Sequence, residues 1–125
     1  MDQVSRNFRY SEFGDSLSDS DRIKIRWLVF GVLQRVRDYF GKPVKITSWK
    51  RDKDKNAAVG GSSTSQHPNG EAVDFIVEGI SARAVYDYID MVIKWPYGQL
   101  FYYPDKGHVH VGLGRFDIAP NRGRM

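Results

Sequence analysis

The sequence contains no cysteine among its 125 residues. This absence excludes disulfides and thiolate metal ligands, and it leaves the redox compartment open. No apolar run is long enough to cross a membrane, so we predict no membrane span. The stretch after Met1 lacks a cationic segment followed by an apolar one, so we expect a chain made in the cytoplasm without a signal peptide. Repeats, linkers and low-complexity blocks are also lacking, and we predict one domain over residues 1–125.

The composition suits a folded chain with a mild basic excess. Hydrophobic residues make up 41% and aromatic residues 14%, which is enough for a real core. The net charge of +4 favours encounter with anionic partners such as cell wall or nucleic acid. The basic residues are not gathered into a stripe, which argues against a nucleic-acid-binding protein.

Two segments have helical periodicity. The first begins near Ser20, where Ser18 or Asp19 can cap it, and ends at Gly41. Its apolar residues recur every three or four positions and form one stripe: Ile25, Leu28, Val29, Val32, Leu33, Val36 and Phe40. The second is capped by Ser81 and runs to about Lys94, with one apolar face: Val85, Ile89, Val92 and Ile93. We also expect the aromatic residues Phe8, Tyr10 and Phe13 to cover the core.

Four segments read as strands: 44–48, 71–77, 99–103 and 108–113. In the first, Val44, Ile46 and Ser48 alternate with Lys45 and Thr47. The turn at 104–107 joins the last two strands into a hairpin. Because strands and helices do not alternate strictly, we predict an α+β fold, with a small, mainly antiparallel sheet of about four strands packed against two longer helices. The basic tail 121–125 is expected to be loose.

Candidate metal ligands lie in two separate stretches. Asp74 begins an apolar run, and a buried carboxylate needs a partner or a metal. All three histidines of the chain lie in these two stretches. His67 comes seven residues before Asp74 in the first stretch. His108 and His110 lie in the second, on one face of the expected strand, and are roughly 7 Å apart along it. Both strand histidines could bind one metal, or one could bind while the other acts as a base, and a pair of structural histidines is the plain alternative. The combination favours a zinc site.

This inventory suffices for amide hydrolysis. Three protein ligands and a water are typical of catalytic zinc. Zinc activates the water and polarises a carbonyl, and a neighbouring base transfers the proton. Arg51 follows directly from a strand end, and its planar donors suit a developing oxyanion.

The residues resemble a known family. The segment Ser65-x-His67-x-x-Gly70-x-Ala72-x-Asp74 is similar to the signature of the zinc D-alanyl-D-alanine metallopeptidases, and His108-x-His110 is similar to the second motif of the group that also holds lysostaphin-type enzymes and the hedgehog amino-terminal domain. Ser48-Trp-Lys-Arg51 resembles the group's Ser-Gly-Tyr-Arg stretch, with Trp49-Lys50 in place of Gly-Tyr. Asn56-Ala-Ala-Val-Gly-Gly-Ser and Asn121-Arg look like the phage and bacterial branch known as peptidoglycan-peptidase C-terminal domains. The resemblance spans Phe8 to Arg122.

The resemblance implies a fold like that of this group and a role for seven residues. One zinc per chain would be bound by His67, Asp74 and His110. His108 would be the catalytic base, and Arg51 would stabilise the oxyanion or grip the substrate carbonyl. Ser65 and Gln66 would line the site.

We therefore expect a zinc metallopeptidase that acts on peptidoglycan stem peptides. The cut would be made either at D-Ala-D-Ala, as a carboxypeptidase, or at an internal bond, as an endopeptidase. A monomer acting at the bacterial cell wall, as a phage lysis enzyme (endolysin) or a minimal wall-remodelling enzyme, fits the small size. The alternative is a zinc-binding interaction module that has lost catalysis, although His108 and Arg51 argue against it.

Overall fold

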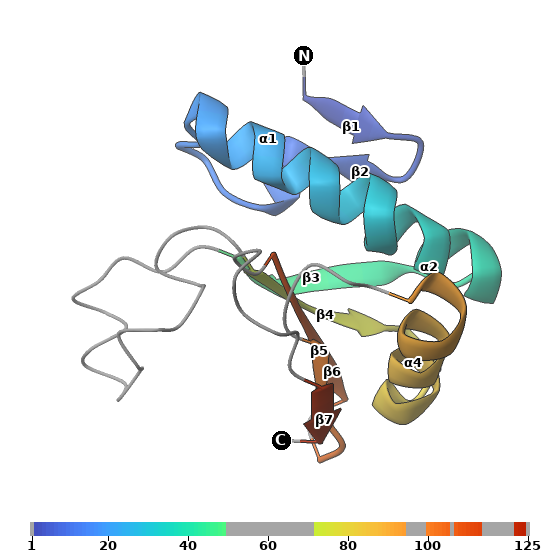
Figure 1. Ribbon diagram of the computed structural model, residues 1–125. Coiled ribbons are helices and arrows are strands. Elements are labelled where there is room, and N and C mark those ends of the chain that lie inside the picture. Colours follow the sequence, from blue (N-terminus) through green and yellow to red (C-terminus); the bar gives the residue numbers. More distant parts are fainter. Residues whose placement is uncertain (1, 50–71, 95–99, 106, 114–121, 125) are drawn as a thin grey trace.

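The molecule is built on a five-stranded sheet (Figure 1). The computed structural model describes residues 2–49, 72–94, 100–105 and 107–113, and the backbone of 122–124. The strand order is β3-β4-β6-β5-β7, with these bounds: β3 Val44–Ser48, β4 Ala72–Val77, β5 Leu100–Tyr103, β6 His108–Gly112 and β7 Arg122–Arg124. Each of the four predicted strands is antiparallel to its neighbours among them. The predicted α+β fold, with its mainly antiparallel sheet, is confirmed.

Strand β7 is a correction to the sequence prediction, because residues 122–124 are not loose. They pair in parallel with β5, and Leu100 lies opposite Arg122. Backbone groups at the edge of β5 can form ladder hydrogen bonds with the backbone of another segment, whatever side chains that segment carries. The polar and basic composition of residues 122–124 therefore did not reveal this strand.

The first long helix begins and ends where the sequence predicts. It consists of α1 (Asp19–Leu28), a π-helical turn η2 (Val29–Leu33) and α2 (Gln34–Phe40). The Ser18 hydroxyl accepts from the Asp21 amide at 3.1 Å, and the Asp21 carboxylate accepts from the Ser18 amide at 3.0 Å, which forms a capping box. Gly41 ends the helix in the left-handed conformation, with φ of 66°.

The second helix also changes to a π-helical turn. It comprises α4 (Ala82–Tyr88) and η4 (Ile89–Ile93), and the Ser81 hydroxyl accepts from the Ala84 amide at 3.1 Å. The wider π turn keeps Ile93 on the same side of the helix as Ile89, and it rotates Val92 toward solvent. Val92 is therefore 57% exposed, and its predicted place on the apolar face is wrong.

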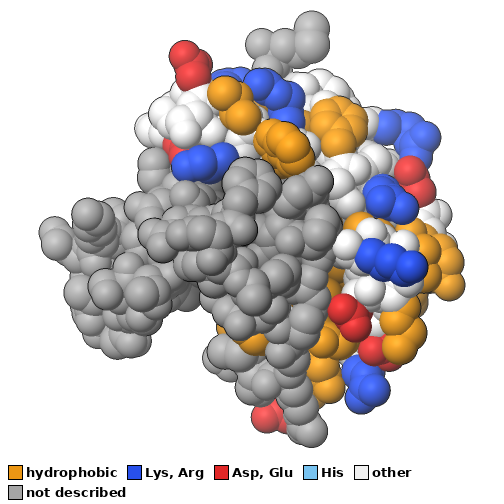
Figure 2. Space-filling view, in the orientation of Figure 1, with side chains coloured by type: hydrophobic (Ala, Val, Ile, Leu, Met, Phe, Trp, Pro, Cys, Tyr) orange, Lys and Arg blue, Asp and Glu red, His pale blue; other side chains and the backbone are white. Residues whose placement is uncertain are grey.

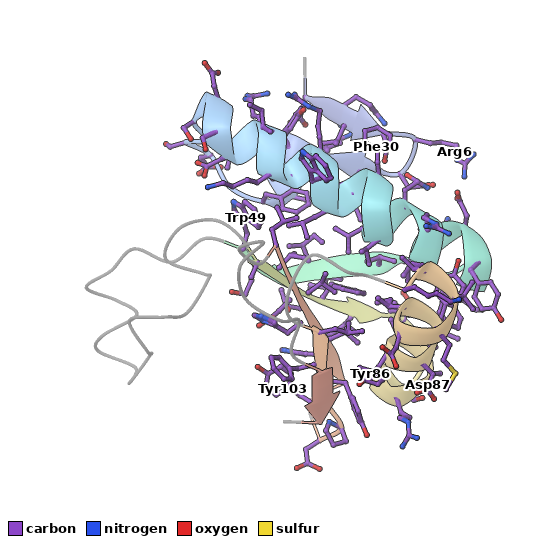
Figure 3. All side chains as sticks on the ribbon, viewed as in Figure 1. Arg6, Phe30, Trp49, Tyr86, Asp87 and Tyr103 are labelled. Atoms are coloured by element: carbon purple, nitrogen blue, oxygen red, sulfur yellow. The ribbon has the colours of Figure 1, made fainter. Side chains whose placement is uncertain are left out.

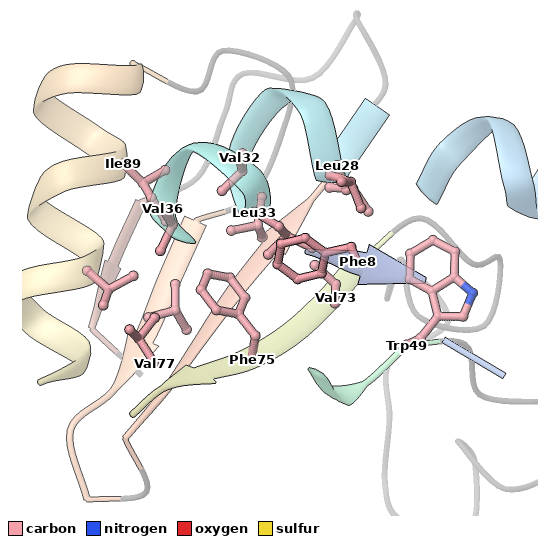
Figure 4. Close-up of a cluster of buried hydrophobic side chains, with 14 of the residues drawn as sticks. Phe8, Leu28, Val32, Leu33, Val36, Trp49, Val73, Phe75, Val77 and Ile89 are labelled. Carbon is pink, nitrogen blue, oxygen red and sulfur yellow. The ribbon is translucent and has the colours of Figure 1, made fainter. Parts of the chain in front are cut away.

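One hydrophobic core lies between the sheet and the helices (Figure 4). Both helices cover the same face, and Val36 and Ile89 meet Phe75 and Val77 there. The N-terminal strands β1 (Gln3–Ser5) and β2 (Phe8–Arg9) form a separate pair, followed by the 3-10 turn η1 (Tyr10–Glu12). The predicted burial of the three aromatic residues in this region is confirmed: Phe8, Tyr10 and Phe13. Among the residues described, no helix has the length and apolar character needed to cross a membrane.

Candidate active site

An aspartate and a histidine meet on the two central strands of the sheet. Asp74 on β4 and His110 on β6 are direct partners in the antiparallel register. Their side chains therefore share a face, and His110 Nδ1 lies 2.7 Å from Asp74 Oδ1. The sequence neighbours of both residues are buried in the core: Val73 and Phe75 beside Asp74, and Val109 and Val111 beside His110. The alternation of each strand thus sends the valines and phenylalanine into the core and the polar pair to the opposite face.

The pair is shielded from solvent. His110 is 7% exposed, and the side chain of Asp74 is 13% exposed. An ionised carboxylate can only accept a hydrogen bond, so Nδ1 of His110 is the donor in this contact. The expectation was that a buried Asp74 needs a partner or a metal, and His110 is a partner of its carboxylate here.

Small residues lie beside the pair. Ala72 lies opposite Gly112, one step along the same face of β4 and β6. Neither residue has a side chain extending past Cβ, and both are buried, so the pair is bordered on this side by a closed part of the sheet face.

His108 lies on the same face as His110 but does not join the pair. It is half-buried and sits opposite Tyr103, with the two rings 6.4 Å apart in an edge-to-face arrangement. Among the residues described, no three acidic, histidine or cysteine side chains form a group that could hold a metal ion. Asp74 and His110 therefore stand as two candidate ligands, with His108 set apart.

Two aromatic residues flank the histidines and were not singled out from the sequence. Phe101 lies opposite His110 with ring centroids 6.0 Å apart, and Tyr103 lies opposite His108. Tyr103 projects from the side of the sheet away from α4 (Figure 3). The four-residue turn between Tyr103 and His108 could have indicated these pairings, because the turn length fixes which residues of the two strands lie opposite each other.

A register shift at the end of β3 changes the predicted alternation. Ile46 lies opposite Phe75, but Ser48 lies opposite Asp74, so one extra residue is accommodated on β3. The expectation that Ser48 shares a face with Ile46 is wrong, because the shift turns Ser48 toward the face of Asp74. Trp49, which follows it, is buried.

Trp49 serves the core. Its ring meets Phe13 edge to face at 5.6 Å, and it lies under α1 (Figures 3 and 4). The residue that replaces glycine in the resembled Ser-Gly-Tyr-Arg stretch is therefore a packing residue in this chain.

Four of the predicted site residues lie outside the described part of the chain: Arg51, Ser65, Gln66 and His67. Their predicted roles stay predictions. The structure places the other three, and it brings Asp74 and His110 into contact.

The two contacting atoms suit zinc. An imidazole nitrogen and a carboxylate oxygen are both ordinary zinc ligands, and two such ligands of one tetrahedral zinc are roughly 3.3 Å apart. Nδ1 of His110 and Oδ1 of Asp74 are 2.7 Å apart, so a small side-chain rotation, with zinc taking the place of the proton on Nδ1, would bring them to that separation. The donor set therefore fits a zinc ion.

Comparison with known proteins points to one family. A family model described as Peptidase M15 matches residues 7–112, which include Asp74, His108 and His110. No curated protein matches the chain.

Proposed function

Because the chain belongs to the peptidase M15 family of zinc D-alanyl-D-alanine metallopeptidases, we propose that it hydrolyses amide bonds in the stem peptides of bacterial peptidoglycan. Family membership supports a zinc-dependent peptidase in general. The contact between His110 Nδ1 and Asp74 Oδ1 carries the proposal to this chain's own residues, because two of the three proposed ligands meet there. The enzyme would act at the cell wall.

The proposed zinc ligands are His67, Asp74 and His110. Asp74 and His110 are held by neighbouring central strands, so their separation is fixed by the sheet. A site on strands is more precisely positioned than a site on loops. Zinc bound there would lower the pKa of a water and polarise the scissile carbonyl.

His108 is the proposed base. It lies on the face of the ligand pair, near it but apart from it, which supports a role different from that of His110. A neutral imidazole there would take a proton from the attacking water and give it to the leaving amine. Arg51 would donate hydrogen bonds to the oxyanion, and Ser65 and Gln66 would contact the stem peptide.

The direct test combines metal content with activity. Protein purified without added metal should contain one zinc per chain and should clear peptidoglycan in a zymogram, and a chelator should abolish the clearing until zinc is restored. Mass spectrometry of the products then assigns the bond, because release of free D-alanine indicates a carboxypeptidase and larger fragments indicate an endopeptidase. Folded, active protein without stoichiometric metal would refute the proposal.

A matched pair of substitutions ties the result to the site. Asp74→Asn keeps the shape of the side chain but removes the anionic ligand, so zinc and activity should fall together. Asp87→Asn makes the same chemical change on α4, where Asp87 pairs with Arg83 at 3.2 Å on the surface. The second variant should keep both zinc and activity. Equal zinc content in the two variants would remove Asp74 from the ligand set.

A further inference from the structure

An exposed apolar stripe runs along the outer side of the first helix. Ile23, Trp27 and Phe30 are 49%, 52% and 56% exposed. Their spacing of four and then three residues places them on one helical face. Figure 2 shows hydrophobic side chains gathered over this helix, and Phe30 is labelled on it in Figure 3.

The core does not need this stripe. The inward face of the same helix is already filled by other apolar residues, among them Ile25, Leu28 and Val29, which are fully buried. The outer face of a surface helix is ordinarily polar, and neighbouring large apolar side chains on it indicate an interaction surface.

The helix that carries the stripe has an excess of positive charge, although the exposed Asp19 lies one turn before Ile23. Residues 19–40 contain five basic and three acidic side chains. Two of the acids are engaged locally, because Asp21 is buried in the capping box and Asp38 pairs with Arg6. Arg26 is exposed, and its guanidinium donates to the neutral Tyr10 hydroxyl at 3.0 Å, a contact that leaves its positive charge in place.

We propose that the stripe of Ile23, Trp27 and Phe30 docks on the surface of an anionic lipid bilayer. A helix with aromatic and aliphatic residues on one side and basic residues beside them lies in the interface, with its apolar side chains among the lipids. Trp27 suits this position because an indole is apolar in its body and polar at its N–H. A second copy of the chain is a poorer partner, because symmetric pairing of this face would bring like charges together.

A bilayer docked on this face would not cover the candidate active site. The stripe points away from the sheet, whereas Asp74 and His110 project from the face of the sheet opposite the helices. A bilayer bound at α1 and the site at β4 and β6 are therefore separated by the whole thickness of the core. The proposal depends only on the helix and does not require the enzymatic activity.

Vesicle binding tests the proposal. We would measure partitioning of the full chain onto vesicles of phosphatidylglycerol mixed with phosphatidylcholine, and onto vesicles of phosphatidylcholine alone. Because each aromatic side chain is about half exposed, Trp27→Gln and Phe30→Gln should each weaken binding to the mixed vesicles by about tenfold. Arg26→Gln should weaken it by about fivefold, with a smaller loss at high salt.

The control is Met91→Gln on η4, which removes an apolar side chain that is more exposed still, from a different helix. This variant should bind the mixed vesicles within about twofold of the parent chain. Circular dichroism should show the same helix content in all variants. Equal binding to the neutral and the anionic vesicles would overturn the proposal. Undiminished binding by the Trp27→Gln/Phe30→Gln double variant, or dimerisation through this face in sedimentation, would also overturn it.

Discussion

Alanine substitutions of the two β6 histidines should fail in different ways. His110→Ala removes a buried ring whose Nδ1 donates to Asp74 at 2.7 Å. His108→Ala removes a half-buried ring that packs edge to face with Tyr103. The first change disturbs the interior of the sheet and the second mainly its surface, so the two variants are separable even before metal is added.

The size of the effect follows from these contacts. In metal-free protein, His110→Ala loses a hydrogen bond to a charged group, worth about 1.5–3 kcal/mol, and leaves unfilled volume. We expect a loss of roughly 3 kcal/mol, or about 10 °C in melting temperature for a domain of this size. His108→Ala should cost less than about 1 kcal/mol, because its ring is partly in solvent.

With zinc present, the difference becomes functional. His110→Ala should lose zinc and activity together, because only two of the proposed protein ligands remain. His108→Ala should keep zinc and the fold, while its turnover falls by about 10²–10⁴, the usual value of positioned proton transfer.

Three measurements on both variants check this reasoning: zinc content, thermal unfolding after chelation, and hydrolysis of a stem peptide. If His108→Ala loses zinc while His110→Ala keeps it, the assignment of ligand and base is reversed. If both lose zinc, His108 is a fourth ligand and the open-site mechanism fails. If His110→Ala and the parent chain have the same melting temperature after chelation, the hydrogen bond to Asp74 has no stabilising role.

Three further predictions concern other parts of the chain. Arg51→Lys should lower turnover by about 10²–10³ in a stem-peptide assay, because lysine keeps the charge but lacks the planar donors; full activity would place Arg51 outside the site. Trp49→Ala should destabilise the fold by about 3–5 kcal/mol in denaturant unfolding, since the buried indole packs on Phe13; an unchanged midpoint would contradict its core role. Hydrogen bonds from Ser11 lower the pKa of Asp2. The parent chain should therefore be more stable to unfolding than Asp2→Asn near neutral pH, and this difference in stability should disappear as pH falls below about 4; a difference in stability that persists in acid would refute this.

The helices were largely predictable because their signals are local. Ser18, Ser81 and Gly41 act within one turn of the helix ends, and apolar periodicity reports which side is buried. The π turns were not predictable, because five-residue spacing is a response to tertiary packing and has no sequence signature of its own. That is why Val92 was misplaced while Val85 and Ile89 were not.

The candidate site was predictable in its chemistry but not in its assembly. The sequence singles out Asp74 and His110 as groups that need polar partners, yet 36 residues separate them and strand order is a tertiary property. Their direct pairing requires β4 and β6 to be neighbours, which only the assembled sheet shows. Ser48 was misplaced for a similar reason, because a single-residue register shift reverses every side chain that follows.

The order of the strands bears on how the protein avoids aggregation. In the described sheet the outermost strands are β3 and β7, whose outer backbone groups could template pairing with another chain. Strand β3 carries the exposed Lys45, and the three residues of β7 are Arg-Gly-Arg. Positive charges on both margins repel a second copy that approaches edge to edge. Substituting Lys45 and the two arginines with threonine should therefore promote fibrous association at concentrations at which the parent chain stays dispersed.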